Sequence, residues 1–228
     1  MENKPALVRL GELDAIEFPC KDPQALTVVC MHGYGADMRD LAPLAPEIPV
    51  TRPVRWIFPE GPEVLDWGGR AWFPIDVAAF EEAQRTGKAR DLSDREPEGM
   101  KESRLAVQGL LKELDAPPER LVLMGFSQGA MMAVDLALHL GHPPAGVGIL
   151  SGTLVNLKLL GALAPKLKGV PFFQSHGSVD PILGFTQALA LEKELKAAGW
   201  KGALSRFEGG HAIPPATLEE LGAWLQAL

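Results

Sequence analysis

The sequence predicts an α/β protein with a mostly parallel central sheet and helices on both faces. Short apolar runs alternate along the chain with segments whose apolar residues recur at helical spacing, which is typical of parallel strands joined by helical crossovers. The chain has 228 residues, of which 46% are apolar and 22% are charged. These values are those of an ordinary soluble globular protein, and they suit one domain over residues 1–228 better than two.

Apolar runs give the strands of the predicted sheet. The clear strand candidates are residues 26–31, 54–58, 121–124, 147–150 and 170–175. A weaker sixth candidate covers residues 203–207, and residues 7–18 could supply one or two antiparallel edge strands. The connections between the clear candidates are long enough for helices, as parallel strands require.

Helical spacing marks the segments between the strands. Apolar residues recur at i, i+3, i+4 and i+7 from Val107 to Leu114, and Ser93 with the acidic residues that follow it predicts the start of this helix. The segment from Ser127 to His139 is apolar nearly all round, which indicates a helix buried in the centre of the fold. Two further helices are expected around residues 188–195 and 218–228.

Residues 79–95 stand apart because they are charged and show no clean period. They predict a solvated surface loop, with a mobile flap beside the active site as the alternative.

The charge balance argues against polyanionic partners. The chain carries 22 basic and 29 acidic residues, for a net charge of −7, and no cluster of lysine and arginine stands out. We therefore expect neither nucleic-acid binding nor stable membrane insertion. The N-terminal residues lack the apolar core of a signal peptide, so a cytoplasmic location is the default. Neither of the two cysteines has metal-ligand spacing, and a disulfide between them is not expected without export.

The most informative stretch is Gly125-Phe126-Ser127-Gln128-Gly129. It lies between an apolar strand pattern and an apolar helix pattern, so Ser127 sits at a sharp strand-to-helix turn where side chains beside it would not fit. Such a turn lifts the hydroxyl above the end of the sheet, at a helix N-terminus that favours negative charge. Ser127 is therefore the candidate nucleophile; the alternative is a glycine-softened turn in an ordinary α/β protein.

A serine nucleophile needs a histidine base, and His211 is the candidate. Proteins with this kind of turn place serine, carboxylate and histidine in that chain order, which excludes His32. His139 and His142 lie at the far end of the helix that Ser127 begins, roughly 18 Å or more away. His211 follows two glycines after the last strand candidate, where a loop can swing over the carboxyl end of the sheet. The alternative is an exposed loop histidine.

The base needs a carboxylate partner, and Asp180 is the candidate. It follows the strand predicted at residues 170–175, and so lies at the carboxyl end of the sheet, where open α/β sheets place their sites. The other carboxylates between serine and histidine lie within helices or too close to His211; they are Asp135, Glu192, Glu194 and Glu208. The alternative for Asp180 is a turn-forming residue before Pro181.

Two backbone N–H groups are expected to bind the oxyanion that forms during acyl transfer. One belongs to Gln128, the residue after the nucleophile. The other is expected from Tyr34 in His32-Gly33-Tyr34-Gly35, which follows the first clear strand and has glycines for close approach. His32 would then brace this loop.

Together these motifs resemble the phospholipase/carboxylesterase family, which includes small bacterial carboxylesterases and acyl-protein thioesterases. The resemblance runs from about residue 26 to the C-terminus. The segments that carry it are His32-Gly33-Tyr34-Gly35, Arg70-Ala71-Trp72-Phe73-Pro74-Ile75, Gly125-Phe126-Ser127-Gln128-Gly129-Ala130-Met131, Ser151-Gly152, His176-Gly177-Ser178-Val179-Asp180-Pro181-Ile182 and Gly210-His211.

The resemblance implies an α/β-hydrolase fold without a large cap domain, and hydrolysis of carboxylic esters or thioesters. It assigns the catalytic triad to Ser127, Asp180 and His211, and the oxyanion donors to Tyr34 and Gln128. It also implies an apolar substrate pocket lined by Trp72, Phe73, Leu154 and Ile182. The alternative for the two aromatic residues is a place in the core. Tyr34 and Pro74 depart from residues common in the family, which bears on substrate choice.

The sequence thus predicts a serine hydrolase that cleaves a small-molecule carboxylic ester through an acyl-enzyme, with no metal or organic cofactor. The main alternative is an acyl-thioesterase or lysophospholipase for long chains. Dienelactone-type hydrolysis usually uses a cysteine nucleophile, and a catalytically silent binding protein would not need the triad. Small hydrolases of this kind often pair, so a homodimer is left open.

Overall fold

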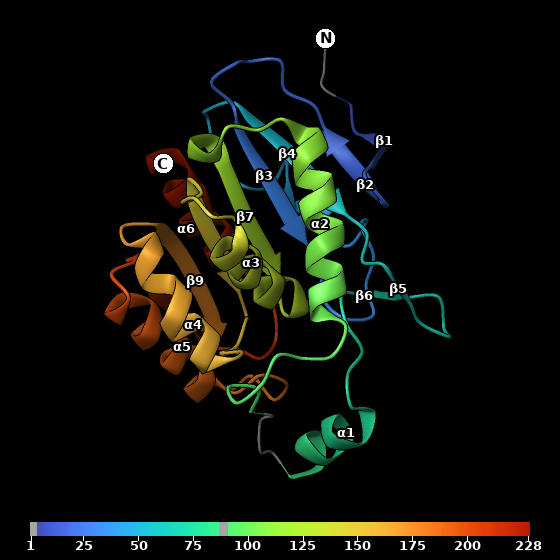
Figure 1. Cartoon of the computed structure of the whole chain (residues 1–228), viewed down its shortest axis with the longest axis vertical. Helices are drawn as coiled ribbons and strands as arrows, with labels where there is room; N and C mark the ends of the chain where they lie inside the picture. The colour runs from blue at the N-terminus through green and yellow to red at the C-terminus, as the bar shows by residue number, and fades with distance from the viewer. Residues whose placement is uncertain (1–3, 87–90) are drawn as a thin grey trace.

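An eight-stranded sheet runs through the centre of the molecule (Figure 1). The computed structural model describes residues 4–86 and 91–228. The strand order is β1-β2-β4-β3-β7-β8-β9-β10, in which β1, β2 and β4 pair antiparallel and the remaining neighbours pair parallel. The strands are β1 (Ala6–Leu10), β2 (Leu13–Phe18), β3 (Leu26–Met31), β4 (Val54–Pro59), β7 (Leu121–Phe126), β8 (Gly146–Leu150), β9 (Pro171–Gly177) and β10 (Lys201–Phe207).

The strand predictions are confirmed. Each apolar run forms a strand of the sheet, the structure extends most runs by one or two residues, and residues 7–18 supply the two antiparallel strands β1 and β2. The central strands β3 and β8 are buried along their whole length, which explains why they read as continuous apolar runs. A separate two-stranded ribbon, β5 (Glu63–Val64) with β6 (Arg70–Ala71), extends from the edge of the molecule (Figure 1).

Helices cover both faces of the sheet and bury two apolar layers. One layer packs under α2 (Met100–Leu114), α3 (Gln128–His139), α4 (Leu157–Leu163) and α5 (Phe185–Ala197). The other packs under α6 (Pro215–Ala227) and the 3-10 turn η1 (Ala42–Leu44). Two further 3-10 turns are η2 (Pro118–Arg120) and η3 (Ala164–Leu167).

The start predicted for α2 at Ser93 is wrong, because the helix begins at Met100. The residue before it, Gly99, has a left-handed φ of 81°. Residues 92 and 93 are instead bonded to the segment before α4: the N–H of Asn156 donates to Leu92 O and that of Leu157 to Ser93 O. These long-range bonds hold the chain away from the α2 axis.

The loop predicted at residues 79–95 is also partly wrong. Helix α1 (Val77–Thr86) occupies its first half and lies outside the two apolar layers (Figure 1). Residues 87–90 lie outside the described part of the chain. The alternative, a mobile flap beside the active site, stays a prediction.

Two smaller findings concern membranes and cysteines. In the described ranges, none of the helices has the length and apolarity needed to cross a bilayer. Cys20 and Cys30 are both free thiols, and burial raises the pKa of Cys30 in β3.

Candidate active site

Ser127 occupies a strained turn between β7 and α3. Its backbone has φ 55° and ψ −116°, a conformation that costs a residue with a side chain roughly 1–3 kcal/mol. Its N–H donates to Leu150 O at 2.8 Å, which ties the turn to the end of β8. Such strain persists only where the surroundings enforce it, and it is common at functional sites.

The two glycines of the motif are required by their surroundings. A Cβ on Gly125 would lie 2.3 Å from the backbone of Gly129, and a Cβ on Gly129 would lie 2.0 Å from Met31 O. Any side chain at either position would therefore push α3 away from β3 and β7. The close approach sets the N-terminus of α3 directly against the ends of these strands.

Asp180 and His211 are joined by a short hydrogen bond. His211 Nδ1 lies 2.6 Å from Asp180 Oδ2, and the two side chains are 16% and 0% exposed. Asp180 follows the end of β9, and His211 follows β10, so two neighbouring parallel strands deliver the pair to one edge of the sheet. With Asp180 bonded to Nδ1, Nε2 of His211 is the nitrogen left to exchange a proton with another group.

Other groups fix the Asp180 carboxylate. Its Oδ1 accepts from the N–H of Ile182 at 2.8 Å and from that of Leu183 at 3.0 Å. The fully buried His176 places Nε2 3.2 Å from Asp180 Oδ2 and 2.6 Å from Leu183 O. Burial alone would raise the pKa of Asp180, but hydrogen bonds from His176, His211 and the N–H of Leu183 outweigh it and hold that pKa well below its usual range.

Ser127 and His211 line the same pocket, of about 240 Å³. Within the described residues, Ser127 Oγ forms no hydrogen bond, so the hydroxyl and the imidazole face the pocket without being bonded to each other. The ring of His211 packs on Phe126 at a centroid distance of 4.8 Å, and Ser151 Oγ donates to Ala212 O at 3.3 Å. These contacts hold the histidine loop beside the serine turn.

Tyr34 and Gln128 lie at the same pocket. The loop that carries Tyr34 touches the nucleophile turn, since a Cβ on Gly33 would lie 3.4 Å from Ser127 Cβ. The N–H of Gln128 is the first of α3 and has no helical partner, and the N–H of Tyr34 donates no backbone bond within the described residues. Both N–H groups are thus free to bind an anion next to Ser127.

His32 braces the Tyr34 loop. Its Nδ1 lies 2.7 Å from Gly33 O, and its Nε2 accepts from the N–H of Gly61 at 2.9 Å. This pattern requires the neutral ring with the proton on Nδ1. Burial is the main cause of the lowered pKa of His32.

The side chain of Gln128 positions the pocket wall. Its Oε1 accepts from the N–H of Trp72 at 2.8 Å, and its Nε2 donates to Phe73 O at 2.7 Å. Gln128 therefore connects the start of α3 to the segment that carries Phe73.

The structure places only two of the four expected pocket residues at the pocket. Phe73 and Ile182 line it, whereas Trp72 and Leu154 are buried in the apolar layer under α2 to α5. Trp72 is held there by its ring contact with His32, and its Nε1 donates to His32 O. The expectation for Trp72 and Leu154 is therefore corrected: both are core residues. Lining residues that the sequence analysis did not single out are Pro74, Ile75, Leu92, Pro97, Met131 and Leu183.

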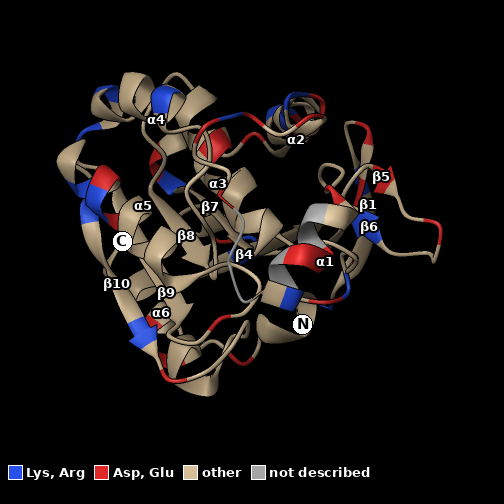
Figure 2. Ribbon diagram, turned by 90° about the horizontal axis from the view of Figure 1, so that it is seen from below, with Lys and Arg blue, Asp and Glu red and all other residues tan. Residues whose placement is uncertain are grey.

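Charged side chains lie beside the pocket but do not line it. None of its lining residues in the described ranges is Asp, Glu, Lys or Arg. A neighbouring groove of about 740 Å³ shares four lining residues with the pocket, and it is lined by Asp76, Asp91, Glu96, Glu98 and Arg95. Figure 2 looks onto the carboxyl edge of the sheet, with α1 and its charged residues beside it. The site is thus an apolar pocket that adjoins a largely acidic groove.

Comparison with known proteins gives consistent matches over nearly the whole chain. Residues 14–228 match the profile of the family described as phospholipase/carboxylesterase. Acyl-protein thioesterase 1 of Cryptococcus neoformans var. neoformans is 28% identical over 90% of this chain and 93% of its own length. The protein of the same name from Neurospora crassa is 31% identical over 75% of this chain and 71% of its own.

Solved structures agree with this result. The crystal structure of esterase PE8 has a TM-score of 0.77 at 26% identity, covering 94% of this chain and 98% of that one. A carboxylesterase from Mesorhizobium loti has the same TM-score at 19% identity over 100% of both chains, which shows the shared fold.

The sheet order, the serine turn and the Asp180–His211 pair at the carboxyl edge define an α/β hydrolase without a large cap domain. The profile match narrows this class further. The chain belongs to the phospholipase/carboxylesterase family, and it is a serine hydrolase of that family.

Proposed function

We propose that this protein is a carboxylesterase that hydrolyses small carboxylic esters through an acyl-enzyme on Ser127. His211 takes the proton of the Ser127 hydroxyl as Oγ attacks the carbonyl carbon, and it then gives that proton to the leaving alcohol. Water then enters, loses one proton to His211 and attacks the carbonyl carbon of the acyl-enzyme. The bond between that carbon and Ser127 Oγ breaks, His211 returns the proton to Oγ, and the carboxylic acid leaves.

Each remaining group has a part in this cycle. Asp180 holds His211 with Nδ1 protonated and stabilises the imidazolium that forms. The N–H groups of Tyr34 and Gln128 stabilise the oxyanion, and a donor of this type is worth roughly 3–4 kcal/mol in the transition state. The bonds of His32 and of the Gln128 side chain keep both donors in place.

The observation that carries the proposal is the Asp180–His211 bond at the pocket that Ser127 lines. The pair has the geometry of the base and its orienting carboxylate. Ser127 Oγ, which lacks a hydrogen bond in the described residues, faces the same pocket. We propose that it closes the relay to Nε2 of His211 when substrate enters, since catalytic hydrogen bonds often tighten only in the substrate complex.

Substitution of the nucleophile tests the proposal directly. Ser127→Ala should lower the hydrolysis of p-nitrophenyl butyrate by about 10⁴-fold or more and abolish labelling by a fluorophosphonate probe. Ser205→Ala, on the edge strand β10, is the matched control and should keep both. Circular dichroism would verify folding. A folded Ser127→Ala variant that still hydrolyses the ester at the wild-type rate would exclude Ser127 as the nucleophile.

A thioesterase is the second candidate, because the curated relatives carry the name acyl-protein thioesterase 1. The same acyl-enzyme can form from a thioester. We favour esters with short acyl groups, because the pocket of about 240 Å³ is smaller than typical ligand pockets of roughly 300–1,000 Å³. Rates on butyryl and palmitoyl esters, and on the matching thioesters, would separate the two functions.

A further inference from the structure

Met131 lines the active-site pocket from helix α3. It follows Ser127 by four residues, so it stands one helical turn along α3 on the same side as the nucleophile. It is buried, and it lines both the active-site pocket of about 240 Å³ and a separate inner cavity of about 20 Å³. Among the described residues it is the one that lines both, so we infer that its side chain separates the two spaces.

The inner cavity is lined by residues of α2, α3, α4 and α5 and of the segments before α2 and α4. It has room for about one water molecule. Apolar side chains make up most of its wall, among them Val134, Leu138, Leu160 and Leu191. Glu96, which also lines the acidic groove, and Asp135 line the cavity as well, but both carboxylates are paired with Arg104.

The two ends of the active-site pocket differ in chemistry. We call the side lined by Pro74, Ile75, Leu92 and Pro97 the outer end, because these residues also line the acidic groove. We call the side at Met131, which also lines the inner cavity, the inner end. An acyl chain gains by burial against apolar walls and loses by lying among carboxylates. The acyl group also stays bonded to Ser127 after the alcohol has left, so a closed apolar end suits it, whereas the leaving alcohol needs the open end.

We propose that Met131 sets the acyl-chain length that the enzyme accepts. Short acyl chains end against its side chain, and longer chains are excluded because they would have to enter the space that it fills. The inference rests on the proposed esterase function and adds the substrate class: esters of short-chain carboxylic acids.

The test is a rate profile over p-nitrophenyl esters from acetate to palmitate. Met131→Ala removes three heavy atoms beyond Cβ, which joins the inner cavity to the pocket. The best substrate should then become longer by about three carbons, and each methylene newly buried should raise kcat/KM roughly fourfold. Met131→Phe adds bulk at the same place and should move the optimum to shorter chains.

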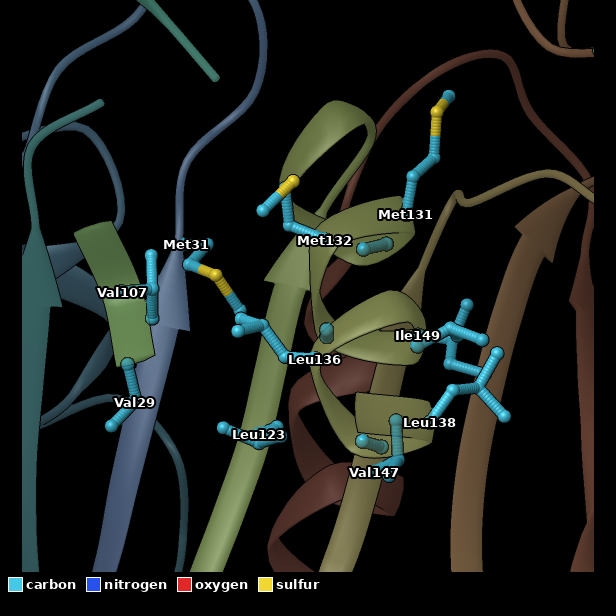
Figure 3. Close-up of a cluster of buried hydrophobic side chains, with 14 of the residues drawn as sticks. Val29, Met31, Val107, Leu123, Met131, Met132, Leu136, Leu138, Val147 and Ile149 are labelled. Carbon is cyan, nitrogen blue, oxygen red and sulfur yellow. The ribbon is translucent and has the colours of Figure 1, made fainter. Parts of the chain in front are cut away.

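Met132→Ala is the matched control. Met132 is the same residue type, lies next in the chain and is fully buried, but it does not line the pocket. Figure 3 shows the two side chains leaving α3 in different directions. Met132→Ala should lower the melting temperature and leave the chain-length profile as in the wild type.

The outcomes separate the two proposals. A wild-type protein that hydrolyses none of the esters would overturn the esterase function itself. An active wild type whose profile is unchanged in folded Met131→Ala and Met131→Phe would overturn the role of Met131 alone, and so would an equal shift in Met132→Ala. If Met131→Ala does not fold, Met131→Phe decides. A second series, butyrate esters of alcohols of rising length, should show no shift; a shift there would mean that the pocket holds the alcohol.

Discussion

At the scale of single residues, the Asp180 carboxylate is held by a second histidine that the chemistry does not require. His176 is fully buried, and its Nε2 reaches both Asp180 Oδ2 and Leu183 O. Its Nδ1 has no hydrogen-bond partner in the described residues, so the ring is oriented by the Nε2 contacts. We infer that His176 is a positioning residue: it holds the carboxylate that in turn holds His211.

This role predicts a difference between two substitutions of His176. His176→Leu removes the N–H donor and should lower kcat by about 10- to 100-fold with little change in KM, since small misplacements near the reacting groups have effects of this size. His176→Gln can place an amide N–H where Nε2 lies and should restore much of kcat. Kinetics with p-nitrophenyl butyrate well below the melting temperature would check this.

A purely structural role would give another pattern. In that case both variants would lose thermal stability, and kcat measured on folded protein would stay at the wild-type value. Equal losses of kcat in His176→Gln and His176→Leu would likewise contradict a role for the donor.

Residue by residue, sequence reasoning placed best the groups whose positions follow from chain order and strand ends. Ser127, Asp180 and His211 all follow strands whose carboxyl ends meet at one edge, and the structure brings them there. Sequence reasoning failed for Trp72, because the sequence pattern of an aromatic residue near a site is the same whether its ring faces the pocket or the core. Met131 could have been found from its spacing of four residues from Ser127 along a helix.

At the scale of elements, a buried ion pair joins α2 to α3. Arg104 Nη1 lies 2.8 Å from both carboxylate oxygens of Asp135, and the side chains are 9% and 6% exposed. Arg104 also pairs with Glu96 at 3.1 Å. Because Glu96 belongs to the segment beside the pocket, this one guanidinium ties two helices and a pocket wall together.

Breaking this pair should be costly. Burial raises the pKa of Asp135, and Arg104 opposes this rise. Arg104→Met leaves the buried carboxyl without its guanidinium partner, and should lower the free energy of unfolding by about 3–5 kcal/mol in urea titrations. The double substitution Arg104→Met with Asp135→Leu should recover most of that loss, since no buried charge remains. The exposed pair Arg9–Asp14, with side chains 61% and 51% exposed, is the control: Arg9→Met should change stability by less than about 1 kcal/mol. If Arg104→Met lowered the free energy of unfolding by less than about 1 kcal/mol as well, the buried pair would not have the stabilising role inferred here.

The elements also show where sequence patterns stop being informative. Apolar runs predicted the central strands such as β3 and β8 most clearly, because burial on both faces leaves a continuous apolar signal. The more exposed edge strands β1, β2 and β10 gave a weaker signal. The start of α2 was missed because bonds from Asn156 and Leu157 hold residues 92 and 93, some 60 positions away in the chain. Helix α1 was missed because the charged residues in and after it were interpreted as a solvated loop, and the helix lies away from the two apolar layers (Figure 1).

At the scale of the whole molecule, acid should weaken the fold through His32. The ring is buried and must stay neutral, because Nε2 accepts from the N–H of Gly61. A proton on Nε2 would face that donor, in addition to the cost of burying a charge. The pKa of His32 is accordingly lowered, chiefly by burial.

The sign of the pH effect follows from this lowered pKa. The unfolded chain binds the proton near the ordinary histidine value of about 6.5, whereas the folded protein binds it only at lower pH. Between these two values the unfolded state holds more protons, so stability falls as the pH is lowered through this window, by at most about 1.4 kcal/mol per pH unit from this one site. Asp180, with a lowered pKa in the fold, contributes its stability above about pH 4 and loses it only in stronger acid.

His32→Gln separates this effect from the other titrating groups. The glutamine amide oxygen can accept from the N–H of Gly61 but cannot be protonated near neutral pH. Urea unfolding followed by tryptophan fluorescence at pH 7.5, 6.5 and 5.5 should give a flatter dependence of stability on pH for His32→Gln than for the wild type. The remaining histidines contribute equally to both proteins, so the difference in slope reports His32 alone. Identical slopes would mean that His32 takes up its proton equally well in the folded and unfolded states.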